Sequence, residues 1–178
     1  MGGAVLFAVD GDANRGVLLM DAGEKALAHA EITNVLSLYY QALDQGDLET
    51  LERFVIAEDA TWVLVQLCED ERVVDESTGR DEILAWFREM FGAGVSMTEG
   101  TVRHYLNTHV IEVEGDAARS TSHLQAIETA GMTNVASGFV RADHVRTSEG
   151  WRIRRYEVEE TITRKDMDAL KATFHASD

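Results

Sequence analysis

The 178-residue sequence contains no proline and only one cysteine, Cys68. Without proline, no helix kink, proline cis peptide bond or proline-rich linker can be invoked. A single cysteine excludes a disulfide within the chain and is typical of a protein of the reducing cytoplasm, which is the location we expect. Cys68 belongs to no CxxC motif or Cys/His cluster, which argues against a zinc site and makes a strand or loop thiol the simpler interpretation.

Basic residues are also few, and long apolar runs are missing. The chain has 16 Lys and Arg against 32 Asp and Glu, a formal net charge of −16. Such a charge repels nucleic acid phosphates and anionic membranes, so we expect neither as a partner. No window approaches the roughly 18 apolar residues of a membrane span. The composition, 45% hydrophobic and 27% charged, is ordinary for a soluble globular protein.

The length fits a single domain, which we assign to residues 22–178. Residues 1–21 have no basic segment before their apolar run and no clear cleavage site, so they make a poor signal peptide. We predict that this stretch is a peripheral N-terminal segment.

Three helices are predicted in the first half of the chain. The range Ala22–Gln45 carries apolar residues at helical spacing and ends before Gly46. Asp47 is predicted to cap a second, shorter helix. A third helix is predicted over Arg80–Phe91, followed by a glycine-containing loop.

Strands dominate the second half. One strand, Asp59–Gln66, lies between the helices, and Cys68–Ser77 is predicted as an acidic loop with a short strand at residues 72–74. The range Thr101–Ile127 then reads as two strands around a turn at residues 114–116. Further strands are predicted at Asn134–Thr147 and Gly150–Arg164, before a short terminal helix at Asp166–Phe174. This order predicts an α+β fold with helices on one face of a strongly curved antiparallel sheet.

The ordered set of short motifs resembles the SnoaL-like branch of the nuclear-transport-factor-2-like superfamily, over roughly residues 28–159. The matching pieces are Tyr39-Tyr40-Gln41-Ala42-Leu43-Asp44 with Gly46-Asp47, Asp59-Ala60-Thr61-Trp62, Gly79-Arg80, Arg103-His104 with Asn107, Gly115-Asp116-Ala117-Ala118, and Gly150-Trp151-Arg152-Ile153. The resemblance implies a cone-shaped α+β barrel in which three N-terminal helices close an apolar pocket. It also implies one of several activities, since relatives include polyketide cyclases, scytalone-type and bile-acid-type dehydratases, isomerases and oxygenase small subunits.

The same resemblance implies a catalytic pair of Asp44 and His104. In the dehydratase relatives an Asp at this helix position orients a strand His that acts as base. A carboxylate that accepts a proton from one imidazole nitrogen fixes the tautomer, and the other nitrogen can then remove a substrate proton. Tyr39 matches a tyrosine that serves the site by hydrogen bonding, and Tyr40 is the second candidate. The alternative is an exposed helix-end Asp and a half-buried strand His.

The remaining candidates depend on strand register. If paired residue numbers in the hairpin sum to about 230, Asn107 faces His123, His109 faces Thr121, and His104 lies on the opposite side. A bulge near Asn107 would reconcile part of this arrangement, so we keep Asn107 and His123 as substrate-binding candidates. His144 is predicted on an outer strand face. No metal site is expected, because the register separates the histidines.

Trp62 and Arg155 complete the predicted substrate contacts. Trp62 belongs to a set of aromatic residues of which most should be core and a few should line the pocket. Arg155 shares the parity of Trp151 and Ile153, so it is a candidate for an anionic substrate group, whereas an ion pair on the outer face is the simpler interpretation.

Two hypotheses follow. The first is a cofactor-free acid–base enzyme, a dehydratase, isomerase or cyclase, that acts on a cyclic, largely apolar small molecule with a carbonyl group. The second is a non-catalytic ligand-binding module or structural subunit of the same fold, such as an oxygenase small subunit. The second predicts that Asp44 and His104 do not touch. In both cases we expect a homodimer or homotrimer.

Overall fold

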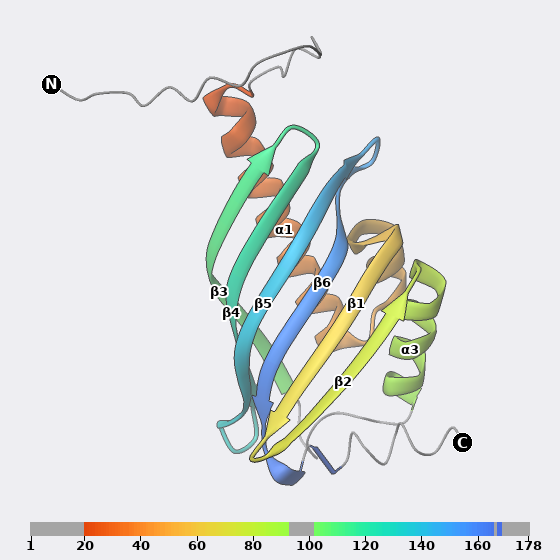
Figure 1. The fold of residues 1–178 in the computed structure, drawn as a ribbon, viewed down its shortest axis with the longest axis vertical. Coiled ribbons are helices and arrows are strands. Elements are labelled where there is room, and N and C mark those ends of the chain that lie inside the picture. Colours follow the sequence, from red (N-terminus) through yellow and green to blue (C-terminus); the bar gives the residue numbers. More distant parts are fainter. Residues whose placement is uncertain (1–19, 93–101, 166, 169–178) are drawn as a thin grey trace, which may run out of the picture.

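The computed structural model describes residues 20–92, 102–165 and 167–168, which form helices on one side of a curved sheet (Figure 1). The predicted α+β fold is therefore confirmed. The peripheral segment 1–21, apart from its last two residues, the loop around Gly94 and most of the predicted helix Asp166–Phe174 lie outside the described residues.

The first helix, α1, spans Ala22–Gln45, as its apolar stripe predicts. Asp21 and Glu24 form a capping box at its start: the Asp21 carboxylate accepts from the backbone N–H of Glu24, and Glu24 accepts from that of Asp21. Gly46 ends the helix in the left-handed conformation, φ 67°, that glycine adopts without strain.

A tight helical segment follows α1. Asp47 caps the short helix α2 (Leu48–Thr50) by accepting from the Thr50 backbone N–H at 3.0 Å. The chain continues as a single π-helical turn, η1 (Leu51–Val55), and enters the sheet. Helix α3, Arg80–Gly92, is one residue longer than predicted.

Among the described residues the sheet has six strands in the order β2-β1-β6-β5-β4-β3. Their bounds are β1 Ile56–Cys68, β2 Glu71–Thr78, β3 Val102–Glu114, β4 Ala117–Glu128, β5 Thr133–Thr147 and β6 Gly150–Ile162. All neighbours are antiparallel except β1 and β6, which are parallel. No pairing joins β2 to β3 in this part of the chain, so the curved sheet is open between its two edges.

The short strand predicted at residues 72–74 is present, but the loop predicted for the rest of Cys68–Ser77 is wrong. These residues supply most of β2, which pairs antiparallel with β1 from Thr61↔Thr78 to Cys68↔Glu71. Charged residues at an edge strand face solvent and give the sequence the appearance of a loop, although the backbone hydrogen bonds to β1 fix it as a strand.

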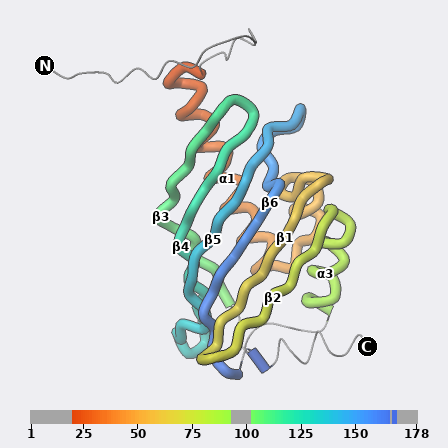
Figure 2. The backbone as a smooth tube through the Cα atoms, in the orientation of Figure 1, coloured from red at the N-terminus to blue at the C-terminus, as the bar shows by residue number. Residues whose placement is uncertain are grey.

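The helices cover one face of the sheet, which we call the inner face (Figures 1 and 2). α1 runs diagonally across β3 to β6, and α3 lies beside β1 and β2. The main apolar core lies between them; its largest fully buried side chains include Trp151, Tyr156, Phe87, Ile32 and Leu36. None of the helices described here is long and apolar enough to cross a membrane.

Candidate active site

Asp44 and His104 are in direct contact. Oδ1 of Asp44 lies 2.6 Å from Nδ1 of His104, and Oδ2 accepts from the His104 backbone N–H at 3.1 Å. Because a carboxylate only accepts, Nδ1 carries the proton and Nε2 is the nitrogen that can take another. The two side chains are 9% and 10% exposed, so the pair is shielded from solvent.

Two elements place this pair. Asp44 stands in the last turn of α1, where the helix dipole alone disfavours a carboxylate. His104 stands near the start of β3, and α1 packs along that strand. The end of a helix presents backbone carbonyl groups, which cannot donate a hydrogen bond to a carboxylate. The backbone N–H of His104 donates one to Asp44 instead.

Tyrosine hydroxyls lie next to the dyad. The Tyr40 ring is 5.4 Å from the His104 ring, and the Tyr40 hydroxyl is hydrogen-bonded to that of Tyr156. Trp62 donates from Nε1 to the Tyr39 hydroxyl at 3.3 Å and stacks on Tyr156, with ring centroids 4.8 Å apart. The three tyrosines and Trp62 therefore form one buried cluster.

Burial controls the ionisation of these hydroxyls. It is the main reason why the pKa values of Tyr39, Tyr40 and Tyr156 all lie well above the usual value of 10. The charge of Glu160 raises the pKa of each further, and that of Asp44 adds to the effect on Tyr40. Each tyrosine thus stays protonated. Because one of the Tyr40 and Tyr156 hydroxyls donates to the other, only one of these two keeps its proton free for another acceptor.

Asn107 and His123 do not join this group. They pair across β3 and β4, as the predicted register requires, and both are exposed on the outer face. His123 packs there against Phe139, with ring centroids 5.1 Å apart. Neither side chain lies on the face that holds His104.

A bulge in β3 changes the position of His109. Thr108 has φ 52°, and the register shifts after Asn107 so that Val110, not His109, faces Thr121. The predicted pairing of His109 with Thr121 is therefore wrong. His109 instead turns to the inner face, where Nδ1 lies 2.8 Å from Oγ of Ser122, and burial lowers its pKa.

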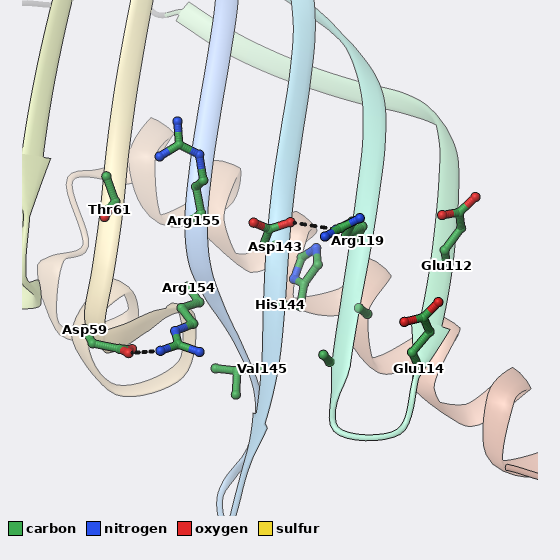
Figure 3. A pocket seen from close by; sticks show the side chains of 12 residues that line it. Asp59, Thr61, Glu112, Glu114, Arg119, Asp143, His144, Val145, Arg154 and Arg155 are labelled. Atoms are coloured by element: carbon green, nitrogen blue, oxygen red, sulfur yellow. Dashed lines mark ion pairs between the residues drawn. The ribbon is translucent and has the colours of Figure 1, made fainter. Parts of the chain in front are cut away.

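Arg155 also lies on the outer face. The register between β5 and β6 shifts from Asp143↔Arg155 to His144↔Ile153, so Arg155 no longer shares the side of Ile153. Its guanidinium donates to Glu157 at 3.0 Å. A hollow of about 450 Å³ surrounds it, where ion pairs join Arg119 to Asp143 and Arg154 to Asp59 (Figure 3).

His144 is buried at 2% exposure, so its predicted outer position is wrong. It pairs in register with the core residue Ala118, and its Nε2 lies 2.8 Å from Oγ of Ser120. Burial lowers its pKa to about 4, which keeps the imidazole neutral. Strand β5 is regular here, so His144 lies on the same face as the buried residues Val140 and Ala142, and this alternation was a signal that the prediction missed.

Three residues on the inner face were not identified as candidates from the sequence: Tyr156, Gln66 and Glu160. All three are buried. For Tyr156 and Glu160 the signal was the alternation of Tyr156, Val158, Glu160 and Ile162 along β6, which puts a tyrosine and a carboxylate among core positions. Gln66 lies on β1, in register with Glu160. In the ranges described, no three His, Cys, Asp or Glu side chains gather as a metal site would require.

The profile of the SnoaL-like domain family matches residues 24–157. No curated protein matches the chain in sequence.

Several solved structures share the fold. A Mycobacterium tuberculosis protein of unknown function superposes with TM-score 0.63 at 16% identity, covering 89% of this chain and 94% of that chain. A proposed scytalone dehydratase from Novosphingobium aromaticivorans gives 0.60 at 19% identity, covering 78% and 87%. A proposed aromatic ring hydroxylase from the same species gives 0.57 at 20% identity, covering 75% and 89%. At these identities the likeness establishes the fold alone.

Proposed function

The chain belongs to the SnoaL-like domain family, and we propose that it is a cofactor-free acid–base enzyme acting on a cyclic, largely apolar carbonyl compound. The observation that carries the proposal is the 2.6 Å contact between Asp44 and His104 inside the protein. A histidine whose Nδ1–H is held by a carboxylate presents Nε2 in one orientation as a general base.

In the proposed reaction, Nε2 of His104 takes a proton from the carbon next to the carbonyl group. Asp44 stabilises the imidazolium that results, because its carboxylate faces the protonated ring. The electrons of the broken C–H bond move toward the carbonyl oxygen, which a tyrosine hydroxyl, Tyr40 or Tyr39, stabilises by donating a hydrogen bond. Return of the proton to another carbon gives isomerisation, and loss of a leaving group gives elimination.

The non-catalytic alternative fits the contact less well. A ligand-binding module or oxygenase subunit has no need of a buried carboxylate–imidazole pair, whose burial costs free energy. Beyond about 5 Å with no bridging water the pair could not work as a base and its orienting group. The distance of 2.6 Å is well within that limit.

The test uses 1-tetralone, a bicyclic aromatic ketone, in deuterium oxide. The wild-type protein should catalyse exchange of the hydrogens at C2, which NMR detects without knowledge of the natural substrate. His104→Ala should abolish the exchange while circular dichroism shows a retained fold. Wild-type exchange at the rate of buffer, or full activity in His104→Ala, would remove the basis of the proposal.

We also propose that two copies associate through the outer face of the sheet. This face exposes apolar side chains, Tyr105, Val110 and Phe139, beside charges of both signs. A face with both signs of charge can be complementary to itself around a two-fold axis. Sedimentation analysis should give a dimer mass for the wild type and a monomer for Phe139→Glu; a monomeric wild type would refute the association.

A further inference from the structure

The sheet ends in two edge strands, β2 and β3, and neither has a second neighbour in the part of the chain that the structure describes (Figure 1). Backbone N–H and C=O groups along such an edge can pair with another strand. A bulge interrupts β3, where Thr108 has φ 52° and the register with β4 shifts, and bulges hinder pairing between edges. β2 has no such interruption, because its register with β1 is continuous from Glu71 to Thr78.

β2 also lacks other features that protect an edge from a second strand. The strand contains no proline and no lysine, and none of its residues has a positive φ. Along its outer side stand Arg72, Val74 and Glu76, all exposed, and Val74 exposes 47% of its surface. Val73, which lies between them, packs inward against the cluster that contains Cys68. The outer side of this edge is thus an exposed valine between two opposite charges.

The two charges have no partner within their own copy. Arg72 and Glu76 form no ion pair and no side-chain hydrogen bond with residues 20–92, 102–165 or 167–168. They cannot pair with each other, since four residues of a strand separate their Cα atoms by roughly 13 Å. Both charges are therefore available to a molecule that binds along the edge.

An antiparallel pairing of β2 with β2 of a second copy matches these side chains. If paired residue numbers sum to 148, Val74 lies opposite Val74 of the second copy, on a two-fold axis. Arg72 of each copy then lies opposite Glu76 of the other, and opposite charges directly across two strands stabilise the pairing. A shift of two residues in either direction would leave one of these charges opposite Val74, so the charges select this register.

We propose that the β2 edge binds a second copy of this chain, which joins two six-stranded sheets into one continuous sheet. The contact uses the same residues of both copies, as a two-fold axis requires. It differs from the association through the outer face, because Phe139 takes no part in it, and it does not depend on the acid–base activity. A contact of five paired residues is small, so we expect a Kd of about 100 µM or above.

Disulfide cross-linking captures such a weak contact. All proteins in the test carry Phe139→Glu, so that the outer face does not contribute. Paired residues of antiparallel strands have Cα atoms about 4.5–5.5 Å apart, which suits a disulfide. Under mild oxidation Val74→Cys should therefore form a covalent dimer on a non-reducing gel. The protein without an added cysteine should form none, because Cys68 is buried.

Arg72→Cys is the matched control on the same edge. In the proposed register the two copies of this position lie roughly 13 Å apart, too far for a disulfide. Val74→Cys should cross-link about tenfold or more faster than this control. A mixture of Arg72→Cys with Glu76→Cys should cross-link about fivefold or more faster than either protein alone, because the two cysteines then face each other.

Exchange of the charges tests the ion pairs. Arg72→Glu, added to Val74→Cys, should slow cross-linking about fivefold, because two like-charge pairs replace the two ion pairs. Further addition of Glu76→Arg restores opposite charges in the reverse order and should restore the rate. Circular dichroism checks that each variant keeps the fold, which the exposure of all three positions leads us to expect.

Three results would overturn the proposal: equal rates for Val74→Cys and Arg72→Cys, a mixture no faster than its components, or a double charge exchange that stays slow. The first would mean that the copies meet only by random collision. None of these results bears on the proposed function, which the hydrogen exchange of 1-tetralone tests separately.

Discussion

Asp44 holds His104 at two points, the ring nitrogen and the backbone N–H, although 60 positions separate the two residues. The double contact fixes both the ring and the strand that carries it relative to the end of α1. The base of the proposed reaction is thus oriented before any substrate enters.

Asp44→Asn should lower the rate of C2 exchange by roughly 10²–10⁴-fold. The amide keeps the size of the side chain but cannot stabilise the imidazolium, and it can hold the ring in the wrong tautomer. Asp47→Asn is the matched control, since asparagine also caps a helix, and its rate should equal that of wild type. Equal rates for both variants would exclude the orienting role of Asp44.

His144 should make the protein less stable as the pH falls. Its pKa is lowered to about 4 in the folded state, against 6.5 for the free side chain, so between these values only the unfolded chain binds the proton. Its contribution is complete above about pH 6.5 and is lost toward pH 4, by roughly 3 kcal/mol in total.

Urea unfolding at pH 7.5 and 4.5 measures this effect. The difference between the two free energies of unfolding should be smaller in His144→Gln than in wild type by about 2–3 kcal/mol. His123→Gln, at an exposed position, should keep the wild-type difference. An unchanged difference in His144→Gln would mean that this imidazole is protonated inside the fold.

Tyr156→Phe should destabilise the fold by about 1–3 kcal/mol, because it leaves the buried Tyr40 hydroxyl without its partner. The double variant Tyr40→Phe/Tyr156→Phe removes both hydroxyls, so its loss should be smaller than the two single losses together. A double-mutant cycle by urea unfolding gives this coupling. Strict additivity would show that the two hydroxyls do not stabilise each other.

Gly138→Ala should destabilise the protein by about 3 kcal/mol or more, because the new methyl group would meet the backbone of β6. Gly92→Ala is the control at the end of α3, where a methyl group meets nothing within 4 Å. That variant should be neutral or more stable by up to about 1 kcal/mol. Thermal unfolding compares them, and a Gly138→Ala protein as stable as wild type would contradict the close approach.

Much of the fold could be predicted from local patterns. The apolar stripe of α1, its end at Gly46, the cap at Asp47 and the turn at Gly115 all follow from short-range chemistry. The family resemblance pointed to Asp44 and His104, which the structure brings together. It could not supply the parallel pairing of β1 with β6, because that pairing depends on residues far apart in the chain.

The faces of His109 and Arg155 were harder to predict, and the reason is the same for both. Alternation assigns a side only while the strand stays regular, and one extra residue moves every later side chain to the other face. The bulge at Thr108 therefore brings His109 inward, and the shift beside Arg154 turns Arg155 outward. Neither irregularity has a glycine at its centre, which is the signal that would have revealed it.

The sequence by itself thus determined most of the elements, their order and the two residues of the Asp44–His104 pair. It did so because helix stripes, caps and turns are local, and because the motifs keep their order along the chain. Only the tertiary structure decided which polar groups share an interior. The buried contact of Gln66 with Glu160 depends on the register of β1 with β6, strands that are distant in sequence, and that of His144 with Ser120 depends on the register of β4 with β5.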